Sequence, residues 1–388
     1  MQSNSAPGTM ERILRLMSEK KASDVYLSSH SPILIRINGQ CVPINDQVLP
    51  ADAPHNLLAE ILAPERMAEL ELTNELNMGF GLENIGRFRI SAMRQRGTIA
   101  AVIRFITIDI PPLANLSVPM ILGELVLQKR GLLLMVGATG AGKSTTLASM
   151  LDHRNQSVSG HILTIENPIE YLFTNRRSVV NQREVGTDTE STQVALRNAL
   201  RQAPDVILIG ELRDRETMTA AIAYAQSGHL CLATLHANNS YHALNRILSF
   251  YPVEVRPTLL GDLAAATNAI VSQRLLRRPT GERVPAVEIL LNTKLIAELI
   301  EKADFNGIKE AMEKAMTEGS QTFEQDIARL IQDGIVERKE GLANADSPTN
   351  LLWRLQNDFR ARDLPSEQHG DDDHDHASFT EITLDVNQ

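Results

Sequence analysis

The chain has 388 residues, of which 43% are hydrophobic, and a formal net charge of −10. This length and composition predict a soluble globular protein with two domains and additional segments. Residues 366–388 contain acidic residues but no Lys or Arg, so most of the negative charge belongs to this tail. The nearly neutral remainder disfavours a nucleic-acid translocase, because such a protein usually carries a basic groove.

The two cysteines, Cys41 and Cys231, are too few for a disulfide framework or a four-cysteine zinc site. We expect both to be buried as small apolar residues in a reducing cytoplasm. Residues 1–7 lack the features of a signal peptide, and no apolar run approaches membrane-spanning length. We therefore expect a cytoplasmic protein without direct membrane insertion, which reaches a membrane only through partners.

The first 106 residues alternate between helical and strand-like patterns. Apolar spacing predicts helices over Met10–Lys20, 57–62 and 65–72, and alternation predicts strands at 25–37, Phe88–Ala92 and Ile99–Phe105. Asn38-Gly39 predicts a hairpin turn. These elements indicate an α+β domain over residues 1–106, and the prolines at 111, 112 and 119 indicate a linker over residues 107–119.

A buried strand, a glycine-rich turn and a helix follow one another around residue 137. The apolar run Leu132–Val136 leads into a turn that ends in Lys143-Ser144, a pattern typical of a phosphate-binding loop. Its glycines allow backbone N–H groups to point at a polyphosphate, Lys143 can reach the β- and γ-phosphates, and Ser144 can ligate Mg²⁺. The predicted nucleotide-binding residues are Gly137, Ala138, Thr139, Gly140, Ala141, Gly142, Lys143, Ser144 and Thr145.

Beyond this loop, strands alternate with helices. The runs at 161–165 and 206–209 are rich in β-branched residues and predict a mostly parallel sheet with helices on both faces, over residues 120–290. Residues 291–362 look mainly helical. Residues 363–388 are predicted to be a disordered acidic tail. Its His and Asp residues are of types that bind metals, but a solvated segment is favoured because a disordered tail has no fixed ligand geometry.

Three further segments place polar side chains next to buried strands. Glu166 and Glu170 follow the strand at 161–165, and Glu170 is a candidate base for activating water, although a solvated loop glutamate is the alternative. Glu211 ends the strand at 206–209, where it can hold Mg²⁺ through a bound water or orient the attacking water. His229 and His236 bracket another apolar strand. A structural role is the usual alternative for either histidine alone, but the pair favours phosphate sensing, and we name His229 as the catalytic candidate.

These four segments, in this order, resemble the Walker A, Asp box, Walker B and His box of the secretion ATPases that serve type II secretion, type IV pili and type IV secretion. The resemblance covers roughly residues 20–345 and implies a RecA-like P-loop ATPase core, a smaller α+β (PAS-like) N-terminal domain and a helical C-terminal region. The short N-terminal domain and the absence of a tetracysteine element resemble the pilus retraction motors of the family. Segments such as 181–186 and 269–275 look like their accessory class.

The sequence departs from the family pattern in two places. Asn167 stands where the Asp box usually has aspartate, and Leu295–Glu301 carries acids where the main retraction motors carry arginine and asparagine. The second departure favours the accessory class. The first leaves the family's usual set of carboxylates incomplete, and it motivates an alternative function, that of a nucleotide-binding adaptor that docks to another motor.

The resemblance also implies cofactors, partners and further site residues. ATP and Mg²⁺ are the implied cofactors, and a homohexamer at the inner-membrane face of the pilus machine is the implied assembly. The implied partners are a PilT-like retraction ATPase and an inner-membrane platform protein, with no nucleic acid. Arg89 and Arg104 match arginines of the family's N-terminal domain that approach the phosphates, although surface salt bridges are the default reading for arginines on strands.

Overall fold

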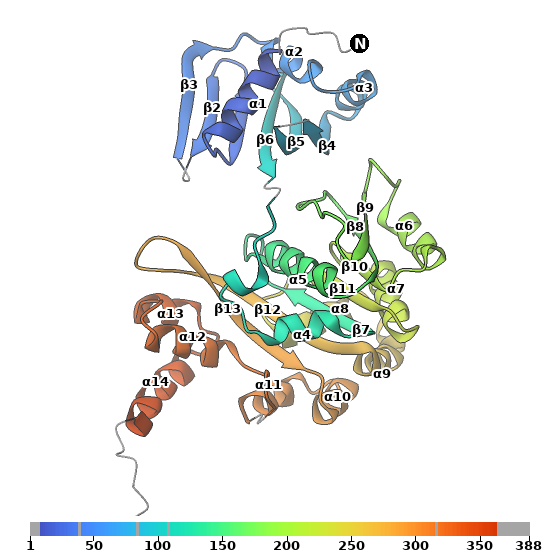
Figure 1. The fold of residues 1–388 in the computed structure, drawn as a ribbon, viewed down its shortest axis with the longest axis vertical. Coiled ribbons are helices and arrows are strands. Elements are labelled where there is room, and N and C mark those ends of the chain that lie inside the picture. Colours follow the sequence, from blue (N-terminus) through green and yellow to red (C-terminus); the bar gives the residue numbers. More distant parts are fainter. Residues whose placement is uncertain (1–7, 38–39, 83–84, 107–108, 315–316, 363–388) are drawn as a thin grey trace, which may run out of the picture.

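The computed structural model describes residues 8–37, 40–82, 85–106, 109–314 and 317–362. Figure 1 shows two parts, each built on its own β-sheet: a small N-terminal part, joined by one segment to a larger part that carries the remaining helices. The predicted turn at Asn38-Gly39 and the predicted tail at residues 363–388 lie outside the described residues.

The N-terminal part is a six-stranded sheet with three helices. Its elements are α1 (Thr9–Glu19), β1 (Asp24–Ser28), β2 (Pro32–Ile37), β3 (Gln40–Val48), α2 (Ala53–Ala59), α3 (Pro64–Thr73), β4 (Glu75–Leu82), β5 (Gly86–Gln95) and β6 (Thr98–Ile106). The strand order is β3-β2-β1-β6-β5-β4, and neighbouring strands are antiparallel. The helices predicted over Met10–Lys20 and 65–72 and the strands predicted around residues 25–37, 88–92 and 99–105 are confirmed. The helix predicted over residues 57–62 lies at Ala53–Ala59 instead. The pattern missed β3, which is exposed along most of its length.

The two faces of this sheet differ in chemistry. Alternate residues such as Val25, Phe88 and Ile103 pack in one hydrophobic core with α1, α2 and α3. Their neighbours in sequence point to the other face because side chains alternate along a strand. Arg89 and Arg104 are directly opposite each other in the β5–β6 ladder, so both lie on this second, polar face.

The larger part is a seven-stranded sheet. After the 3₁₀ turn η1 (Leu113–Asn115) it contains α4 (Ile121–Leu127), β7 (Gly131–Val136), α5 (Lys143–Ser157), β8 (Gly160–Glu166), β9 (Ser178–Glu184), α6 (Thr192–Ala199), η2 (Leu200–Gln202), β10 (Val206–Ile209), α7 (Arg215–Gln226), β11 (Leu230–Leu235), α8 (Ser240–Ser249), η3 (Val253–Val255), α9 (Arg256–Ala266), β12 (Thr267–Arg277) and β13 (Arg283–Leu291). The strand order is β13-β12-β7-β11-β10-β8-β9, and all pairs except β12–β13 are parallel.

Strand β7 lies near the middle of this sheet and is buried on both faces. Leu132, Leu134 and Val136 join the core that also contains residues of α7, α8 and α9. Leu133 and Met135 join a second core with residues of α4 and α5. The predicted parallel sheet with helices on both faces is therefore confirmed.

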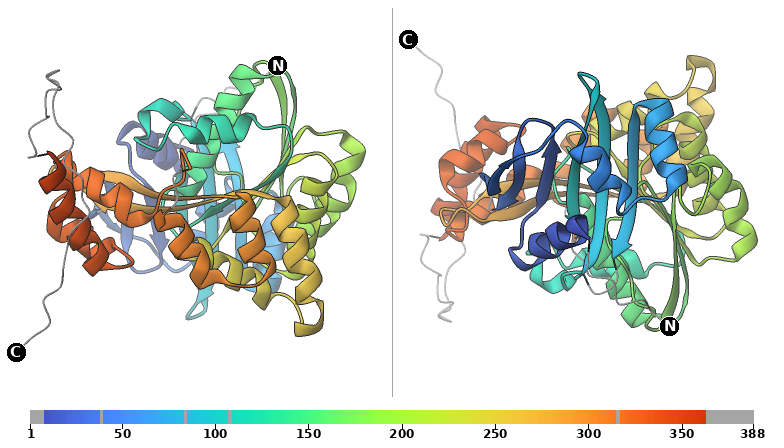
Figure 2. Two further views of the ribbon diagram at one scale, coloured as in Figure 1. Left: turned by 90° about the horizontal axis from the view of Figure 1, so that it is seen from below. Right: turned by 90° about the horizontal axis from the view of Figure 1, so that it is seen from above.

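The C-terminal helices are α10 (Lys294–Glu301), α11 (Phe305–Lys314), α12 (Phe323–Gln332), α13 (Arg338–Asn344) and α14 (Pro348–Arg362). Residues of α12 and α14 form a small core with Leu276 of β12 and Val284 of β13. Both views in Figure 2 place α12–α14 at one side of the molecule, opposite α6 and α7, in agreement with the positions of β13 and β9 at the two edges of the sheet.

Two expectations about composition can be compared with the structure. Cys231 is fully buried in β11, but Cys41 is exposed on β3, so the prediction that both are buried was wrong for Cys41. The reason is that β3 is an edge strand whose side chains have little to pack against. Within the described ranges, no helix combines the length and apolar character needed to cross a membrane.

Candidate active site

The glycine-rich turn lies between the carboxyl end of β7 and the first turn of α5, the place predicted for a phosphate-binding loop. Gly137 has φ +156° and Gly142 has φ +83°, backbone angles that favour glycine. A Cβ atom on Gly137 would also lie 2.6 Å from the carbonyl oxygen of Gln273, so β12 approaches the loop too closely for a side chain. The first N–H groups of α5, which have no acceptor within the helix, come directly after this tight loop.

Gln273 holds this loop from the neighbouring strand. Its side chain, only 2% exposed, accepts a hydrogen bond from the Thr146 hydroxyl (2.9 Å) and donates one to the carbonyl oxygen of Ala141 (2.8 Å). These two bonds join β12 to the loop and to the first turn of α5. The contact spans more than 120 residues of sequence, and no local pattern indicates it.

Lys143 is the first residue of α5, and its ammonium lies at the loop. Nζ donates hydrogen bonds to the carbonyl oxygens of Gly137 (2.7 Å) and Ala138 (2.9 Å). Burial lowers the pKa of Lys143, while the charges of Glu211 and Glu170 act in the opposite direction. Glu211 and Glu170 are thus the acids whose charges favour the protonated form of this ammonium.

Residues of α5 contact the segment after β8 that carries Glu170, which we call the acidic loop (residues 167–171). Ser144 is partly exposed in the first turn of α5, where its hydroxyl is accessible to a metal bound with a phosphate. The Thr145 hydroxyl lies 2.7 Å from the hydroxyl of Tyr171, the residue after Glu170. Tyr171 thus ties the loop that carries Glu170 to the helix that carries Ser144, a contact that sequence reasoning missed.

The parallel strands bring the polar residues to one edge of the sheet. At the carboxyl ends of these strands, Val136 of β7 pairs with Leu235 of β11, and Ile209 of β10 pairs with Ile165 of β8 and with Ala233 of β11. The residues that follow these strands therefore lie beside the glycine-rich loop, as is usual for ligand sites in parallel sheets.

Glu211 follows β10 and has a partner at each carboxylate oxygen. Its Oε1 lies 3.2 Å from Nε2 of His236, which follows β11, and its Oε2 accepts a hydrogen bond from Nε of Arg213 (2.6 Å). The Glu211 side chain is 26% exposed. A carboxylate held from both sides but still open to solvent can bind a hydrated cation or a water molecule.

Glu166 and Glu170 occupy different environments. Burial raises the pKa of Glu166, although hydrogen bonds from the Thr164 hydroxyl (2.6 Å) and the Gln182 amide (3.2 Å) oppose the shift. Glu170 is exposed on the loop after β8. Glu166 is therefore suited to anchoring the loop, and Glu170 to reaching a reactant.

The structure does not bring His229 to this group, which corrects the role that we assigned to it. His229 precedes β11, and its carbonyl oxygen accepts a hydrogen bond from the N–H of Gly131, the first residue of β7. It therefore lies at the amino edge of the sheet, about six residues or 20 Å from the glycine-rich loop. His236, at the other end of the same strand, is the histidine beside Glu211.

Arg89 and Arg104 lie on the polar face of the N-terminal sheet. The Nε of Arg104 donates a 2.9 Å hydrogen bond to buried Asp24, and its side chain is 61% exposed. Among the described residues, no hydrogen bond or ion pair joins either arginine to residues 137–145 of the same chain. Any role at the phosphates therefore requires a domain movement or a neighbouring subunit.

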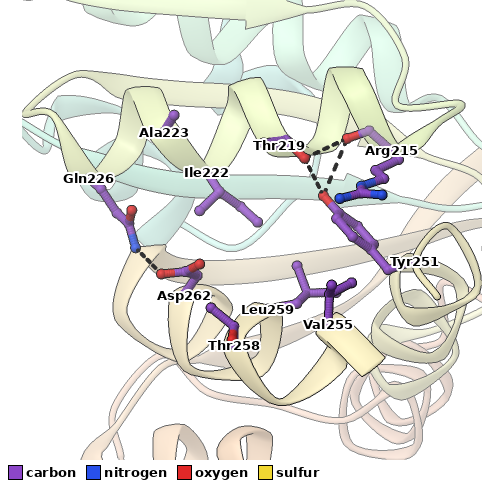
Figure 3. A pocket seen from close by; sticks show the side chains of 10 residues that line it. All are labelled: Arg215, Thr219, Ile222, Ala223, Gln226, Tyr251, Val255, Thr258, Leu259 and Asp262. Carbon is purple, nitrogen blue, oxygen red and sulfur yellow. Dashed lines mark hydrogen bonds between the residues drawn. The ribbon is translucent and has the colours of Figure 1, made fainter. Parts of the chain in front are cut away.

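A separate groove lies between α7 and α9 (Figure 3), with a volume of about 310 Å³. Its polar groups are largely paired with one another: the Arg215 guanidinium lies over the Tyr251 ring, the Tyr251 hydroxyl bonds Thr219, and Gln226 bonds Asp262. None of its lining residues belongs to the glycine-rich loop or the acidic group, so we assign it no ligand.

Comparison with known proteins identifies the family. Residues 4–313 match the family described as "Type II/IV secretion system protein". The chain belongs to this family. The type IV pilus ATPase PilU of Pseudomonas aeruginosa is 44% identical over 347 residues, which are 89% of this chain and 91% of that protein. The type IV pilus retraction ATPase PilT of the same organism is 34% identical over 87% of this chain and 98% of its own length.

Solved structures agree with this assignment. The pilus retraction motor PilT with bound ADP matches with a TM-score of 0.83 and 36% identity, over 90% of this chain and all of that one. The ATPase DotB of Legionella pneumophila matches with a TM-score of 0.76 and 26% identity, over 88% of this chain and 96% of that one. The predicted RecA-like core with an N-terminal domain and C-terminal helices, and the predicted class of enzyme, an ATPase, are therefore confirmed.

The donor groups at the loop fit a nucleotide better than a free metal ion. Within the described residues, no cluster of three or more His, Cys, Asp or Glu side chains could hold a metal by itself. Mg²⁺ commonly takes one or two protein oxygens and completes its shell with phosphate oxygens and waters. The Ser144 hydroxyl and the Glu211 carboxylate supply oxygens of this kind next to a loop shaped for phosphates.

Proposed function

We propose that this chain is an ATP-hydrolysing motor of the PilU kind, which assists retraction of type IV pili and so twitching motility. The observation that carries the proposal is the glycine-rich loop with Lys143 Nζ against the carbonyl oxygens of Gly137 and Ala138, at the sheet edge where Glu170 and Glu211 follow β8 and β10. The similarity to PilU and PilT over most of the chain supplies the pilus context.

Residues 137–145 would hold the phosphates of ATP through backbone N–H groups and Lys143. Ser144 would ligate Mg²⁺ directly and Glu211 through a bound water, and the cation would supply neutralisation of charge on the phosphate oxygens. Glu170, exposed beside the loop, would accept the proton of the attacking water. His236 would keep Glu211 oriented through the 3.2 Å contact between Nε2 and Oε1.

The working assembly in this proposal is a homohexamer at the cytoplasmic side of the inner membrane, where it contacts the pilus platform protein and a PilT-like ATPase. The polar face of the N-terminal sheet offers arginines that a neighbouring subunit's nucleotide could meet in such an assembly. Arg89 and Arg104 point out from that face, and in an oligomer this face can approach a nucleotide and stabilise the charge that develops during transfer. ATP binding and release would then change the position of the N-terminal domain.

The first test of the proposal is the substitution Lys143→Ala. We expect release of phosphate from ATP to fall by about two to three orders of magnitude, because the residue contacts the group that is transferred. Lys302→Ala is the matched control, since Lys302 is exposed beyond α10. Undiminished phosphate release by the Lys143→Ala protein would refute the proposed activity.

A second function, a nucleotide-binding adaptor that docks to a PilT hexamer and has little activity of its own, is favoured by Asn167 in place of the usual aspartate. The two functions differ in how they respond to Glu211→Gln. The motor loses its effect on retraction with this substitution, whereas the adaptor retains it. ATPase activity measured with and without the PilT-like partner distinguishes the two, because the motor hydrolyses ATP alone and the adaptor has little activity of its own. The native mass of each sample shows which assembly is present.

A further inference from the structure

A buried carboxylate joins the N-terminal domain to the ATPase core. Glu184 is the last residue of β9, at the carboxyl edge of the large sheet, and it is 1% exposed. From the core, the Ile169 N–H donates to its Oε2 (3.0 Å) and the Thr187 hydroxyl donates to its Oε1 (3.2 Å). From the N-terminal domain, the Gly79 N–H donates to Oε1 (3.1 Å) and the Arg87 guanidinium donates to Oε2.

The Arg87 guanidinium is the cation paired with this buried charge. The Arg87 side chain is 17% exposed and the Glu184 side chain is 2% exposed, so both partners of the ion pair are largely out of water. Removing one partner of such a pair leaves an uncompensated buried charge, which is strongly unfavourable. The carboxylate therefore keeps its present position only while the N-terminal domain is docked.

Gly79 allows the N-terminal strand β4 to come this close. A Cβ atom at Gly79 would lie 2.8 Å from both carboxylate oxygens of Glu184, which is too short for a real contact. Gly81, two residues further along the same face of β4, has no atom within 4 Å of such a Cβ. The two glycines thus separate the effect of a contact with Glu184 from the effect of an alanine in the strand.

On the side of the ATPase core, the Glu184 carboxylate binds the acidic loop itself. Ile169, which donates to Glu184, immediately precedes Glu170. Strand β9 also binds the loop beyond Glu170, because the Gln182 side chain donates to the carbonyl oxygen of Tyr171 (2.8 Å). Of these two contacts, the one at Ile169 is made by the same carboxyl oxygen that binds Arg87 of the N-terminal domain.

We propose that Glu184 is a positioning residue that makes the placement of Glu170 depend on docking of the N-terminal domain. When the domain is docked, Arg87 and Gly79 hold the carboxylate against the Ile169 N–H and fix the start of the acidic loop. When the domain moves away, the carboxylate loses its cation, turns toward water and releases Ile169. This inference rests on the proposed role of Glu170 in hydrolysis.

The experiment compares Glu184→Gln and Gly79→Ala with the control Gly81→Ala in the full chain. We expect the first two to lower kcat for ATP by about 10- to 100-fold, the range expected when a reacting group is misplaced by about 1 Å. The KM for ATP should change less than about threefold, because the phosphate loop is not touched. Gly81→Ala should retain the wild-type kcat, and thermal unfolding of each variant shows whether it is folded.

A double variant tests whether Gly79 acts through the carboxylate. Glu184→Ala removes the oxygens that a Cβ at Gly79 would meet, so adding Gly79→Ala to it should lower kcat by less than about twofold further. Fully multiplicative losses would overturn the coupling, because sites that act independently combine in that way.

Hydrogen exchange of the amides at residues 169–171 separates this inference from the proposed function. Faster exchange in Glu184→Gln and Gly79→Ala, but not in Gly81→Ala, supports the coupling, and unchanged exchange in both variants overturns it. Glu170→Gln tests the base itself: full ATPase activity in that variant would overturn the proposed role of Glu170, whereas faster exchange in the Glu184 variant would still support the contact between domain and loop.

Discussion

Replacing Gln273 by leucine should loosen the phosphate-binding loop. The buried amide bonds the Thr146 hydroxyl and the Ala141 carbonyl oxygen, and leucine can bond neither. Each polar group left buried without a partner costs about 1–3 kcal/mol, so the two together should lower the free energy of unfolding by about 2–6 kcal/mol. ATP should also bind at least about tenfold more weakly, because the loop loses its contact with β12.

Urea unfolding followed by circular dichroism measures the first effect. The single tryptophan, Trp353, is 64% exposed on α14 and is a poor reporter of the core. Gln226→Leu is the control, since its hydrogen bond to Asp262 is exposed and its loss should cost less than about 0.5 kcal/mol. If Gln273→Leu matches wild type both in unfolding free energy and in the dissociation constant for ATP, this anchor does not hold the loop.

Two further predictions concern buried titratable groups. Burial raises the pKa of Glu288 to about 7, against hydrogen bonds from Ser240 N–H and the Ser272 hydroxyl. Because the folded protein binds this proton more tightly than the unfolded chain does, the contribution of Glu288 to folding is greatest below its unfolded-state pKa. The free energy of unfolding should therefore fall as pH rises from about 4.5 to 7. Urea titrations of Glu288→Gln at several pH values should lack this slope. Burial also raises the pKa of Cys231 to about 12, so a thiol reagent should modify only exposed Cys41 in the native protein; reaction of both before unfolding would contradict the structure.

The local parts of the candidate site carry signals in the sequence. The glycine-rich turn, Lys143 and the acids after strands β8 and β10 are each signalled by a few adjacent residues, and parallel topology then brings them to one edge. Gln273 and Glu184 were missed because their roles depend on contacts across about 100 residues or more. A glutamine in a strand and a glutamate at a strand end carry no pattern that separates them from exposed polar residues.

Strand direction decides which of the two histidines lies at the candidate site. His229 and His236 bracket one strand, and a motif treats them as a pair. In a parallel sheet only the residue after the strand can lie beside the loop that follows β7, and that residue is His236. The sequence already shows that His229 precedes this strand and His236 follows it. Because ligands bind at the carboxyl ends of parallel strands, strand direction alone would have selected His236 over His229.

The buried carboxylate of Asp24 has a consequence for how Arg104 can act. Asp24 contacts two cations, Arg104 at 2.9 Å and Arg36 at 3.8 Å. If Arg104 turns to an incoming anion, Asp24 still retains a counter-ion, so the exchange of partners avoids the penalty of a lone buried charge. Arg89, its neighbour in the ladder, forms no ion pair among the described residues and can turn without breaking one. The Arg36–Asp24 contact thus lowers the electrostatic cost of turning Arg104 toward an anion.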